Sequence, residues 1–295
     1  MSDYIIRATA AEGTVRAIGA VTTEIVREAQ KIHNLSLTAS VALGRTLTGG
    51  ALLSQTLKGD KDVITIQIKG NGPLGGIVVV SDSKANVKGY VDNPDTETFI
   101  NQKGKLKIAA AVGTEGYVNV IKDLGLREPY NGYVRLVSGE IAEDFAFYLT
   151  VSEQIPSVVS LGVLIDKDGS ILNSGGFLIQ VMPDVKNETI DIIEEKTASI
   201  PPVTELLSQG KSMQDILDMI LGSTGLEIHE INECKYLCNC SRERMERNLV
   251  SLGEVEILDM VKEQHGAELV CHFCNKKYYF TEEELLNLVK GINEK

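Results

Sequence analysis

Two short stretches determine the fold expected for the C-terminal part of this chain, Cys238-Asn239-Cys240 and Cys271-His272-Phe273-Cys274. Two pairs of thiols at this separation are typical of a zinc site in which four thiolates surround the metal tetrahedrally. We therefore predict that Cys238, Cys240, Cys271 and Cys274 hold one Zn²⁺ per chain. The fold that follows from this pattern is a small metal-dependent domain at the C-terminal end of a larger body.

The spacing of the first pair, Cys238 and Cys240, leaves two interpretations open. Structural zinc sites normally use C-x2-C or wider spacing, and most four-thiolate sites are structural, so spacing alone favours a purely structural site. A C-x-C pair can also close a small, strained disulfide ring, and strained disulfides tend to be labile or regulatory. The second interpretation is therefore a redox switch.

The fifth cysteine, Cys234, extends the first pair to C-x3-C-x-C. It is a candidate spare ligand or resolving thiol, but a bystander thiol is favoured because four ligands already complete a tetrahedron. All five cysteines lie after residue 233, so the preceding chain uses no disulfide, which fits a reducing compartment.

The N-terminus has no basic region followed by an apolar one, so we expect no signal peptide. The longest apolar stretch, 35–57, contains Arg45 and several Ser and Thr, which makes it too polar for a membrane span. We expect a soluble cytoplasmic protein with no membrane partner.

The fold class predicted for the whole chain is α+β, because antiparallel strands and helices do not alternate regularly. Residues 1–183 form the predicted core domain. It contains a hairpin of 4–8 with 15–21, a helix capped by Thr22-Thr23, and a buried helix over 36–57 whose Gly44, Gly49 and Gly50 permit close approach. Further strands are expected at 63–69, 76–80, 87–91, 117–121, 133–137, 159–165 and 176–181, with a helix over 140–152.

Residues 184–232 are predicted to be a helical linker with little core of its own. Short helices are expected at 188–198, 203–208 and 213–221, the last capped by Ser212 and ended by Gly222. Their apolar stripes, Ile190/Ile193 and Ile216/Leu217/Ile220, must pack on another part of the molecule, because short helices are not stable alone.

Residues 233–295 are the predicted zinc domain. Helices are expected at 242–252 and 255–264, a hairpin around the second cysteine pair, and a last helix opened by a capping box at Thr281 and Glu284. So small a unit is marginal without a staple. Zinc contributes about 10–16 kcal/mol to folding in small metal domains, so losing it should unfold this one.

Several enzyme and nucleic-acid patterns are excluded or disfavoured. The stretch 70–75 matches G-x-G-x-x-G, but a strand follows it, so we predict a hairpin turn rather than a nucleotide site. The chain has no phosphate loop and no G-x-S-x-G motif, and no enzyme activity is expected. The acidic residues Glu140, Glu143 and Asp144 are expected to complement a helix dipole. A net charge of -12 disfavours nucleic acid as a partner.

Motifs along nearly the whole chain resemble one family, the redox-regulated heat-shock chaperones of about 33 kDa, also called 33 kDa chaperonins. They include the two cysteine pairs and, in order, 42–46 (ALGRT), 72–75 (GPLG), 89–94 (GYVDNP), 112–114 (VGT), 122–125 (KDLG), 138–144 (SGEIAED), 152–157 (SEQIPS), 175–177 (GGF) and 180–183 (QVMP). Cys234 is not expected in the family pattern.

The resemblance implies an ATP-independent holdase of the stress response. The reduced protein would bind zinc and be inactive. Oxidants would form the disulfides Cys238–Cys240 and Cys271–Cys274, zinc would leave, and the C-terminal domain would unfold. The linker would then loosen, and the protein would dimerise and hold unfolding client proteins. The resemblance raises the switch above the structural site.

Two other classes compete with this one. An enzyme with a structural zinc domain would show a pocket with strongly perturbed titratable groups. A zinc-ribbon nucleic-acid module would show a basic face, but Arg242, Arg244 and Arg247 alternate with Glu243 and Glu246.

Overall fold

The computed structural model describes residues 2–100 and 104–293, and the chain divides into two compact units, 1–237 and 238–295. The first unit contains two sheets and the helices that pack on them, and the second contains three helices and a hairpin. The α+β class with antiparallel sheets is confirmed. The predicted domain limits at 183 and 232 remain predictions, since the predicted linker packs within the first unit.

The first sheet has five strands, in which every neighbouring pair is antiparallel. Their order is β10 (Glu227–Glu233), β1 (Tyr4–Ala10), β2 (Val15–Val21), β9 (Ile171–Val181) and β8 (Ser157–Ile165). The hairpin of β1 with β2 was predicted, and β8 and β9 contain the strands predicted at 159–165 and 176–181, although β9 begins earlier, at Ile171. The strand β10 was not predicted, because its sequence EIHEINE is polar and its residues are almost all exposed. It owes its conformation to pairing with β1.

The second sheet has six strands, antiparallel except where the two-residue β11 runs parallel to β5. The order is β11 (Lys235–Tyr236), β5 (Asn86–Val91), β4 (Gly76–Asp82), β3 (Val63–Gly70), β6 (Gly116–Asp123) and β7 (Tyr130–Arg135). The turn at 70–75 joins β3 to β4, as predicted. The prediction of a strand at 133–137 was wrong at both ends, because β7 follows its pairing with β6, and the backbone N–H groups of Val137 and Ser138 donate to the buried Asp144 carboxylate.

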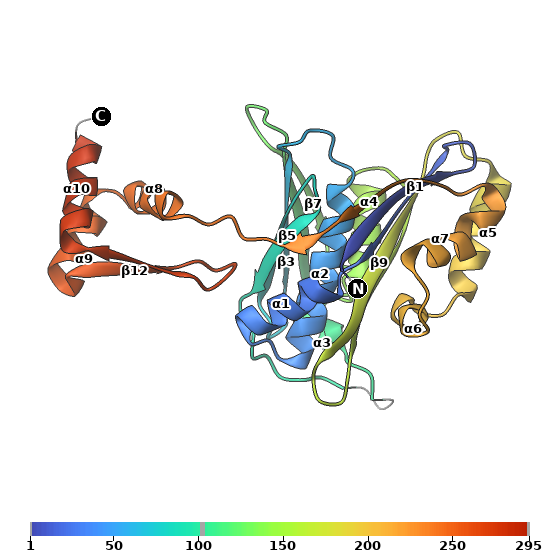
Figure 1. The fold of residues 1–295 in the computed structure, drawn as a ribbon, viewed down its shortest axis with the longest axis horizontal. Coiled ribbons are helices and arrows are strands. Elements are labelled where there is room, and N and C mark those ends of the chain that lie inside the picture. The colour runs from blue at the N-terminus through green and yellow to red at the C-terminus, as the bar shows by residue number, and fades with distance from the viewer. Residues whose placement is uncertain (1, 101–103, 294–295) are drawn as a thin grey trace. The chain divides into compact units, whose positions relative to one another are not determined.

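A layer of helices separates the two sheets, as Figure 1 shows. It consists of α1 (Thr23–His33), α2 (Leu37–Ser54), α3 (Ile108–Val112) and α4 (Ala142–Val151). Nearly all of α2 is buried, and it contacts strands of both sheets. Glycines permit this closeness, since a Cβ at Gly50 would lie 2.8 Å from Val79 Cγ1.

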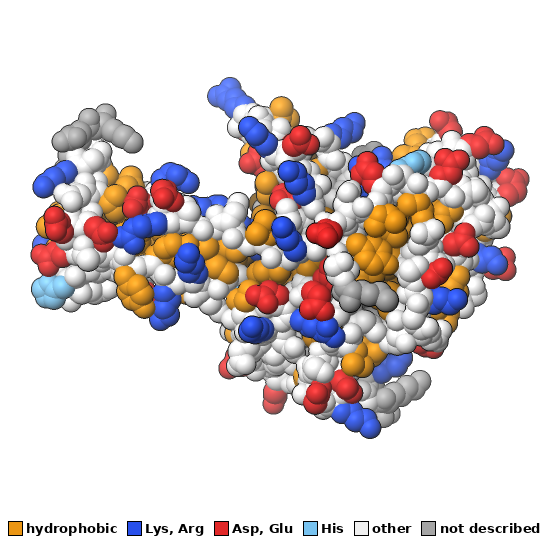
Figure 2. Space-filling view, in the orientation of Figure 1, with side chains coloured by type: hydrophobic (Ala, Val, Ile, Leu, Met, Phe, Trp, Pro, Cys, Tyr) orange, Lys and Arg blue, Asp and Glu red, His pale blue; other side chains and the backbone are white. Residues whose placement is uncertain are grey.

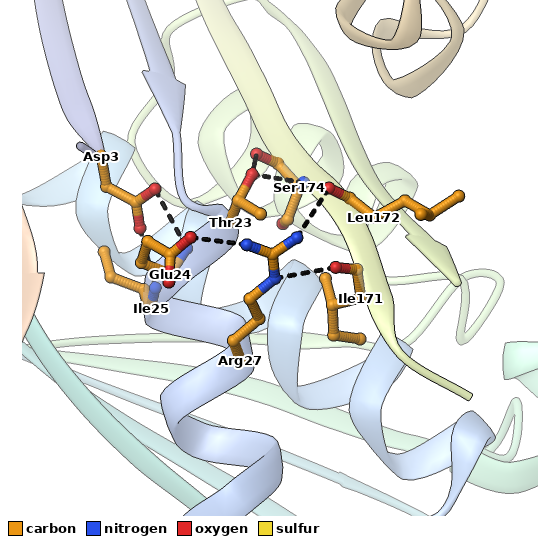
Figure 3. Close-up of polar contacts among 8 residues, drawn as sticks. All are labelled: Asp3, Thr23, Glu24, Ile25, Arg27, Ile171, Leu172 and Ser174. Atoms are coloured by element: carbon orange, nitrogen blue, oxygen red, sulfur yellow. Dashed lines mark hydrogen bonds and ion pairs between the residues drawn. The ribbon is translucent and has the colours of Figure 1, made fainter. Parts of the chain in front are cut away.

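The start of α1 differs from the prediction that Thr22 would cap it. The Thr22 hydroxyl lies 2.6 Å from that of Thr48 and makes no cap hydrogen bond. The buried carboxylate of Asp3 instead accepts hydrogen bonds from the N–H groups of Glu24 and Ile25, at 3.0 and 2.7 Å (Figure 3). In the same view Arg27 ties the helix to the start of β9 through the carbonyls of Ile171 and Leu172.

The opposite face of the first sheet is covered by α5 (Asn187–Ser199), α6 (Val203–Ser208) and α7 (Met213–Leu221), followed by a short 3-10 turn over Gly222–Thr224 (Figure 1). These are the helices predicted for the linker. The Ser212 hydroxyl accepts from Asp215 N, as expected of a cap. Their apolar side chains, including Ile193, Ile216, Leu217 and Ile220, pack with Ile6, Ala8, Phe177 and Ile179 of the sheet. We call this side of the sheet the linker-facing face.

The second unit contains the predicted elements in the predicted order. They are α8 (Arg242–Leu252), α9 (Glu254–Gln264), β12 (Gly266–Val270), β13 (Lys277–Thr281) and α10 (Glu282–Asn293). Thr281 and Glu284 form the predicted capping box, each side chain accepting from the other's backbone N–H. The buried core is small, comprising Met245, Leu249, Ile257, Val261, Cys271, Tyr278, Phe280, Leu285 and Val289. Among the described residues of the chain, no helix has the length and apolar character of a membrane span.

Candidate metal centre

The first cysteine pair lies on the irregular segment that leads into α8. Cys238 and Cys240 follow β11, and the next residue, Ser241, is the N-cap of α8. The Ser241 hydroxyl accepts from Arg244 N, at 3.3 Å, which fixes the point where the helix begins. The capped helix therefore holds the end of the C-x-C segment in one orientation.

The second cysteine pair forms a knuckle between β12 and β13. The N–H groups of Cys274 and Asn275 both donate to the carbonyl of Cys271, and Cys271 N donates to Lys276 O. Asn275 adopts a left-handed conformation, with φ 57°, which Asn tolerates better than most residues. This turn directs two thiols toward one point from a short stretch of backbone.

The four sulfur atoms of the two pairs lie within 4.8 Å of one another. Cys238 Sγ is 3.6 Å from Cys271 Sγ, and Cys240 Sγ is 3.4 Å from Cys274 Sγ. In a tetrahedral zinc site with Zn–S distances of about 2.3 Å, neighbouring sulfurs are about 3.8 Å apart. The arrangement therefore fits a metal ion bound by four thiolates.

These contacts do not select a disulfide pairing. In a tetrahedral site each sulfur is a neighbour of the other three, so Cys238 meets both Cys240 and Cys271. The pairing Cys238–Cys240 and Cys271–Cys274 remains a prediction, as does the assignment of these residues as zinc ligands.

The surroundings of the thiols shift their pKa values in different directions. Burial raises the pKa of Cys238 and, more strongly, that of Cys274. Burial also opposes ionisation of Cys240, but hydrogen bonds from Tyr278 and the neighbouring thiols outweigh it and lower the pKa of Cys240 to about 7. The surroundings of Cys240 thus favour its thiolate, the form that binds metal and reacts with oxidants.

Tyr278 contributes to this site and was not predicted from the sequence. Its hydroxyl lies 3.2 Å from Cys240 Sγ and donates to it, and that hydrogen bond raises the pKa of Tyr278. Hydrogen bonds to metal ligands orient them and adjust their basicity. Only the alternation of β13, which turns Tyr278 and Phe280 into the core, points to Tyr278.

Cys234 lies in the first unit, between β10 and β11, and is not among the four clustered cysteines. Its Sγ is 3.7 Å from Val21 O. Burial and the nearby Asp3 carboxylate raise the pKa of Cys234 to about 12. The thiol is therefore protonated at neutral pH, and protonated thiols are poor nucleophiles.

A cavity of about 360 Å³ next to Cys234 tests the competing enzyme interpretation. Asp3, at its wall, has its pKa raised to about 6, chiefly by burial. Both perturbed groups have structural explanations: Asp3 caps α1, and Cys234 packs in the core. The pair does not provide an activated nucleophile with a base.

The basic residues at the start of α8 do not form a free basic face. Arg242 contacts Glu284 at 2.6 Å, donates to Tyr279 O, and stacks over the ring of Phe280. On the face shown in Figure 2, acidic and basic side chains are interspersed rather than separated. Neither observation favours a nucleic-acid module, which needs clustered cations.

The predicted acidic group at the start of α4 has specific partners. Asp144 accepts hydrogen bonds from Val137 N, Ser138 N and Ile141 N. Glu140 forms an ion pair with Arg45 at 2.8 Å and accepts from Ala109 N. These residues therefore join α2, α3 and α4, which goes beyond the predicted dipole effect.

Comparison with known proteins places the chain among related proteins over its full length. The family model described as "Hsp33 protein" matches residues 3–281. The 33 kDa chaperonin of Acetivibrio thermocellus is 59% identical over 99% of this chain and 98% of its own. That of Clostridioides difficile is 50% identical over 99% and 100%. The crystal structure of a 33 kDa chaperonin (heat shock protein 33 homolog) from Thermotoga maritima superposes with TM-score 0.92 at 40% identity, covering 100% of both chains.

Proposed function

Since the chain belongs to the Hsp33 protein family, we propose that it is an ATP-independent molecular chaperone whose activity is controlled by oxidation. It binds unfolding proteins and prevents their aggregation, and it is not an enzyme. The observation that carries the redox control is the group of four sulfurs within 4.8 Å in a unit with a very small core.

In the reduced state Cys238, Cys240, Cys271 and Cys274 hold one Zn²⁺. When bound, the metal keeps the four thiolates together and contributes about 10–16 kcal/mol to folding, as in other small zinc domains. The second unit buries few apolar side chains, so its own packing does not offset the conformational entropy of about sixty residues. The unit is folded because its cysteines share a ligand.

Oxidation removes this support. Each of the pairs Cys238–Cys240 and Cys271–Cys274, as two thiolates, gives two electrons to a peroxide and forms one S–S bond. The peroxide O–O bond breaks, and the two oxygens take up two protons from solvent and leave as water. The four cysteines would be held as thiolates by the metal, and the thiolate is the form of cysteine that reacts with oxidants. Disulfides no longer supply four thiolates, and the second unit unfolds.

Unfolding of the second unit then loosens the predicted linker. Helices α5, α6 and α7 are short and depend on packing against the linker-facing face. When they detach, apolar residues such as Ile6, Phe177 and Ile179 become available to unfolded clients. The same surfaces allow two activated copies to form a homodimer. The net charge of -12 disfavours a nucleic-acid partner. We place the protein in the cytoplasm, with no membrane partner.

The test combines metal analysis with light scattering from a heat-unfolding client, for reduced and peroxide-treated protein without ATP. We expect one equivalent of zinc and no protection before oxidation, and zinc release with strong protection after it. Reduction with zinc present should reverse both. Equal protection by both forms, with zinc retained in each, would leave only a structural zinc domain.

A cysteine variant provides the matched control for the ligand assignment. Cys274→Ser should lower the zinc content well below one equivalent, because three ligands remain. Cys234→Ser should leave it unchanged, since Cys234 lies in the core of the first unit. Loss of zinc from the Cys234 variant would contradict the assignment.

A further inference from the structure

The strand β10 is the edge of the first sheet and is held by β1 alone. Cys234 N donates to Asp3 O at one end of this pairing, and Ala11 N donates to Thr224 O at the other. The backbone N–H and C=O groups of successive residues point to opposite sides of a strand. Those of the odd-numbered residues Ile5, Arg7 and Thr9 therefore point to β10. The even-numbered residues of β1 present theirs to β2.

The side chains of β10 contribute little to its attachment. Six of its seven residues, all but Ile228, are exposed, and Ile231 is 56% exposed. The polar side-chain contacts with β1 are the exposed Arg7–Glu230 pair at 3.4 Å and the Thr9–His229 contact at 2.7 Å, and Ile228 alone packs against the apolar cluster of the linker-facing face. The pairing is also interrupted by a register shift between Arg7 and Ala8. Backbone hydrogen bonds therefore provide most of what holds β10 in place.

The position of β10 in the chain connects it to both parts that change in the proposed mechanism. Before it come α7 and Gly222–Thr224, and after it come Cys234, β11 and then Cys238. In the proposed mechanism the linker helices before β10 are released, whereas Cys234 and β11 after it stay with the first unit, where Cys234 is buried and β11 pairs with β5. A seven-residue strand held on one edge, with few buried side chains, has little to keep it folded alone.

We propose that the edge of β1 is a binding site for an extended segment of an unfolded client, and that β10 occupies this site in the inactive state. The proposal rests on the chaperone function proposed above and specifies how the client is held. Adding a strand to an open edge uses main-chain hydrogen bonds, which every client offers whatever its sequence. The edge adjoins the linker-facing face, where Ile6 and Ala8 supply apolar contacts.

The direct test is residue-resolved amide hydrogen exchange on the full-length protein, with the same samples assayed for suppression of client aggregation. In oxidised protein the amides of Ile5 and Arg7 should exchange about tenfold faster or more than in reduced protein. Adding an unfolded client should slow them again. The amides of Ile6 and Ala8, which face β2, are the internal control and should stay protected throughout.

Each other result overturns the proposal. Oxidised protein could suppress aggregation while the amides of Ile5 and Arg7 stay protected from exchange without client, or still exchange fast when client is added. Either result would mean that only this proposal is wrong. If these amides become protected without client as protein concentration rises, a second copy is the occupant and the proposal is wrong. If oxidised protein does not suppress aggregation at all, the chaperone function fails, and this proposal fails with it.

A pair of proline variants isolates the competition by β10. Asn232 lies opposite Ile5 and directs its N–H toward β1, whereas the N–H of Ile231 points to the open side. Asn232→Pro should weaken β10 and raise client affinity several-fold after partial oxidation. Ile231→Pro should behave like the wild type. If Asn232→Pro exposes the Ile5 amide but does not change client affinity, the edge is not the client site.

Discussion

Tyr278 contacts the candidate metal centre alongside the four cysteines. Its hydroxyl donates to Cys240 Sγ at 3.2 Å, while its ring packs in the small core. The hydrogen bond stabilises the thiolate and fixes its direction, which is what outer-shell partners of metal ligands do. Tyr278 therefore connects the folding of β13 to the chemistry of Cys240.

We expect Tyr278→Phe to weaken zinc binding about 10- to 100-fold, because the ring is kept and only the hydrogen bond is lost. Competition with a chromogenic chelator measures this affinity. Tyr279→Phe is the matched control, since Tyr279 is the next residue and is 60% exposed. Equal zinc affinity for the two variants would show that the hydroxyl of Tyr278 has no role at the site.

Asp3 carries a pH dependence of stability. Burial is the main reason that the pKa of Asp3 is about 6, above its value of 3.8 in an unfolded chain. Between these two values the folded state keeps a proton that the unfolded state releases. The contribution of Asp3 to the free energy of unfolding is therefore largest below pH 4 and is lost as pH rises through 6.

The variant Asp3→Asn should remove this dependence. Its amide oxygen can still accept from Ile25 N, but it does not titrate. The difference in unfolding free energy between wild type and variant should shift by on the order of 3 kcal/mol between pH 4 and pH 7, with the wild type relatively better at low pH. Urea unfolding followed by circular dichroism at several pH values measures it. A difference that does not change with pH would rule out this role of Asp3.

At the scale of elements, the packing of α7 against the first sheet depends on the absence of a side chain at Gly19. A Cβ at this position would lie 2.5 Å from Met213 Cγ and 3.3 Å from Leu217 Cδ1. Similar close approaches occur between Gly162 and Thr204 of α6, and between Gly175 and Leu207. The linker helices can pack closely on the sheet because glycines leave no side chain at these contact points.

Gly19→Val should therefore push α7 off the sheet, at a cost of about 1–3 kcal/mol for overpacking. If release of the linker helices activates the chaperone, the reduced, zinc-bound variant should already suppress client aggregation. Adding Met213→Ala to make room for the valine should restore the inactive state. A Gly19→Val protein that is inactive when reduced, although α7 has lost protection from hydrogen exchange, would separate linker release from activation.

At the scale of the whole molecule, the four clustered cysteines and the main core belong to different units. All four clustered cysteines lie in the second unit, and the helices between the two sheets lie in the first. The first unit has a continuous core of its own, with Leu43, Leu47, Ile64 and Ile66 among its fully buried side chains. Its folding should therefore not require zinc.

A fragment of residues 1–183 tests this independence together with the predicted domain limit. It should unfold cooperatively in urea with the same midpoint with and without chelator, because it contains no cysteine. Without α5, α6 and α7 its linker-facing face is open, so it should hold clients without oxidation. A collapsed species that lacks a cooperative transition would mean that the limit at 183 is misplaced.

Many helices and strands of this protein can be predicted from short sequence patterns, because they depend on residues close together in the chain. The alternation along β3, the small residues of α2 and the capping box at Thr281 each depend on neighbours within a few residues. The grouping of the four cysteines is similarly predictable, because a shared ligand requires two thiol pairs at suitable spacing. These elements lie where the sequence predicts them.

Other features were decided only by tertiary structure, because they depend on residues far apart in the sequence. The strand β10 exists through hydrogen bonds to β1, more than two hundred residues earlier, and a strand whose side chains are nearly all exposed shows no apolar alternation. Asp3, the residue before β1, caps α1, and Tyr278 meets Cys240 across the second unit. The burial that keeps Cys234 protonated likewise arises from packing between the sheets. Sequence thus determined the elements and the metal-binding pattern, while contacts between distant segments determined how the elements are held and where they can be released.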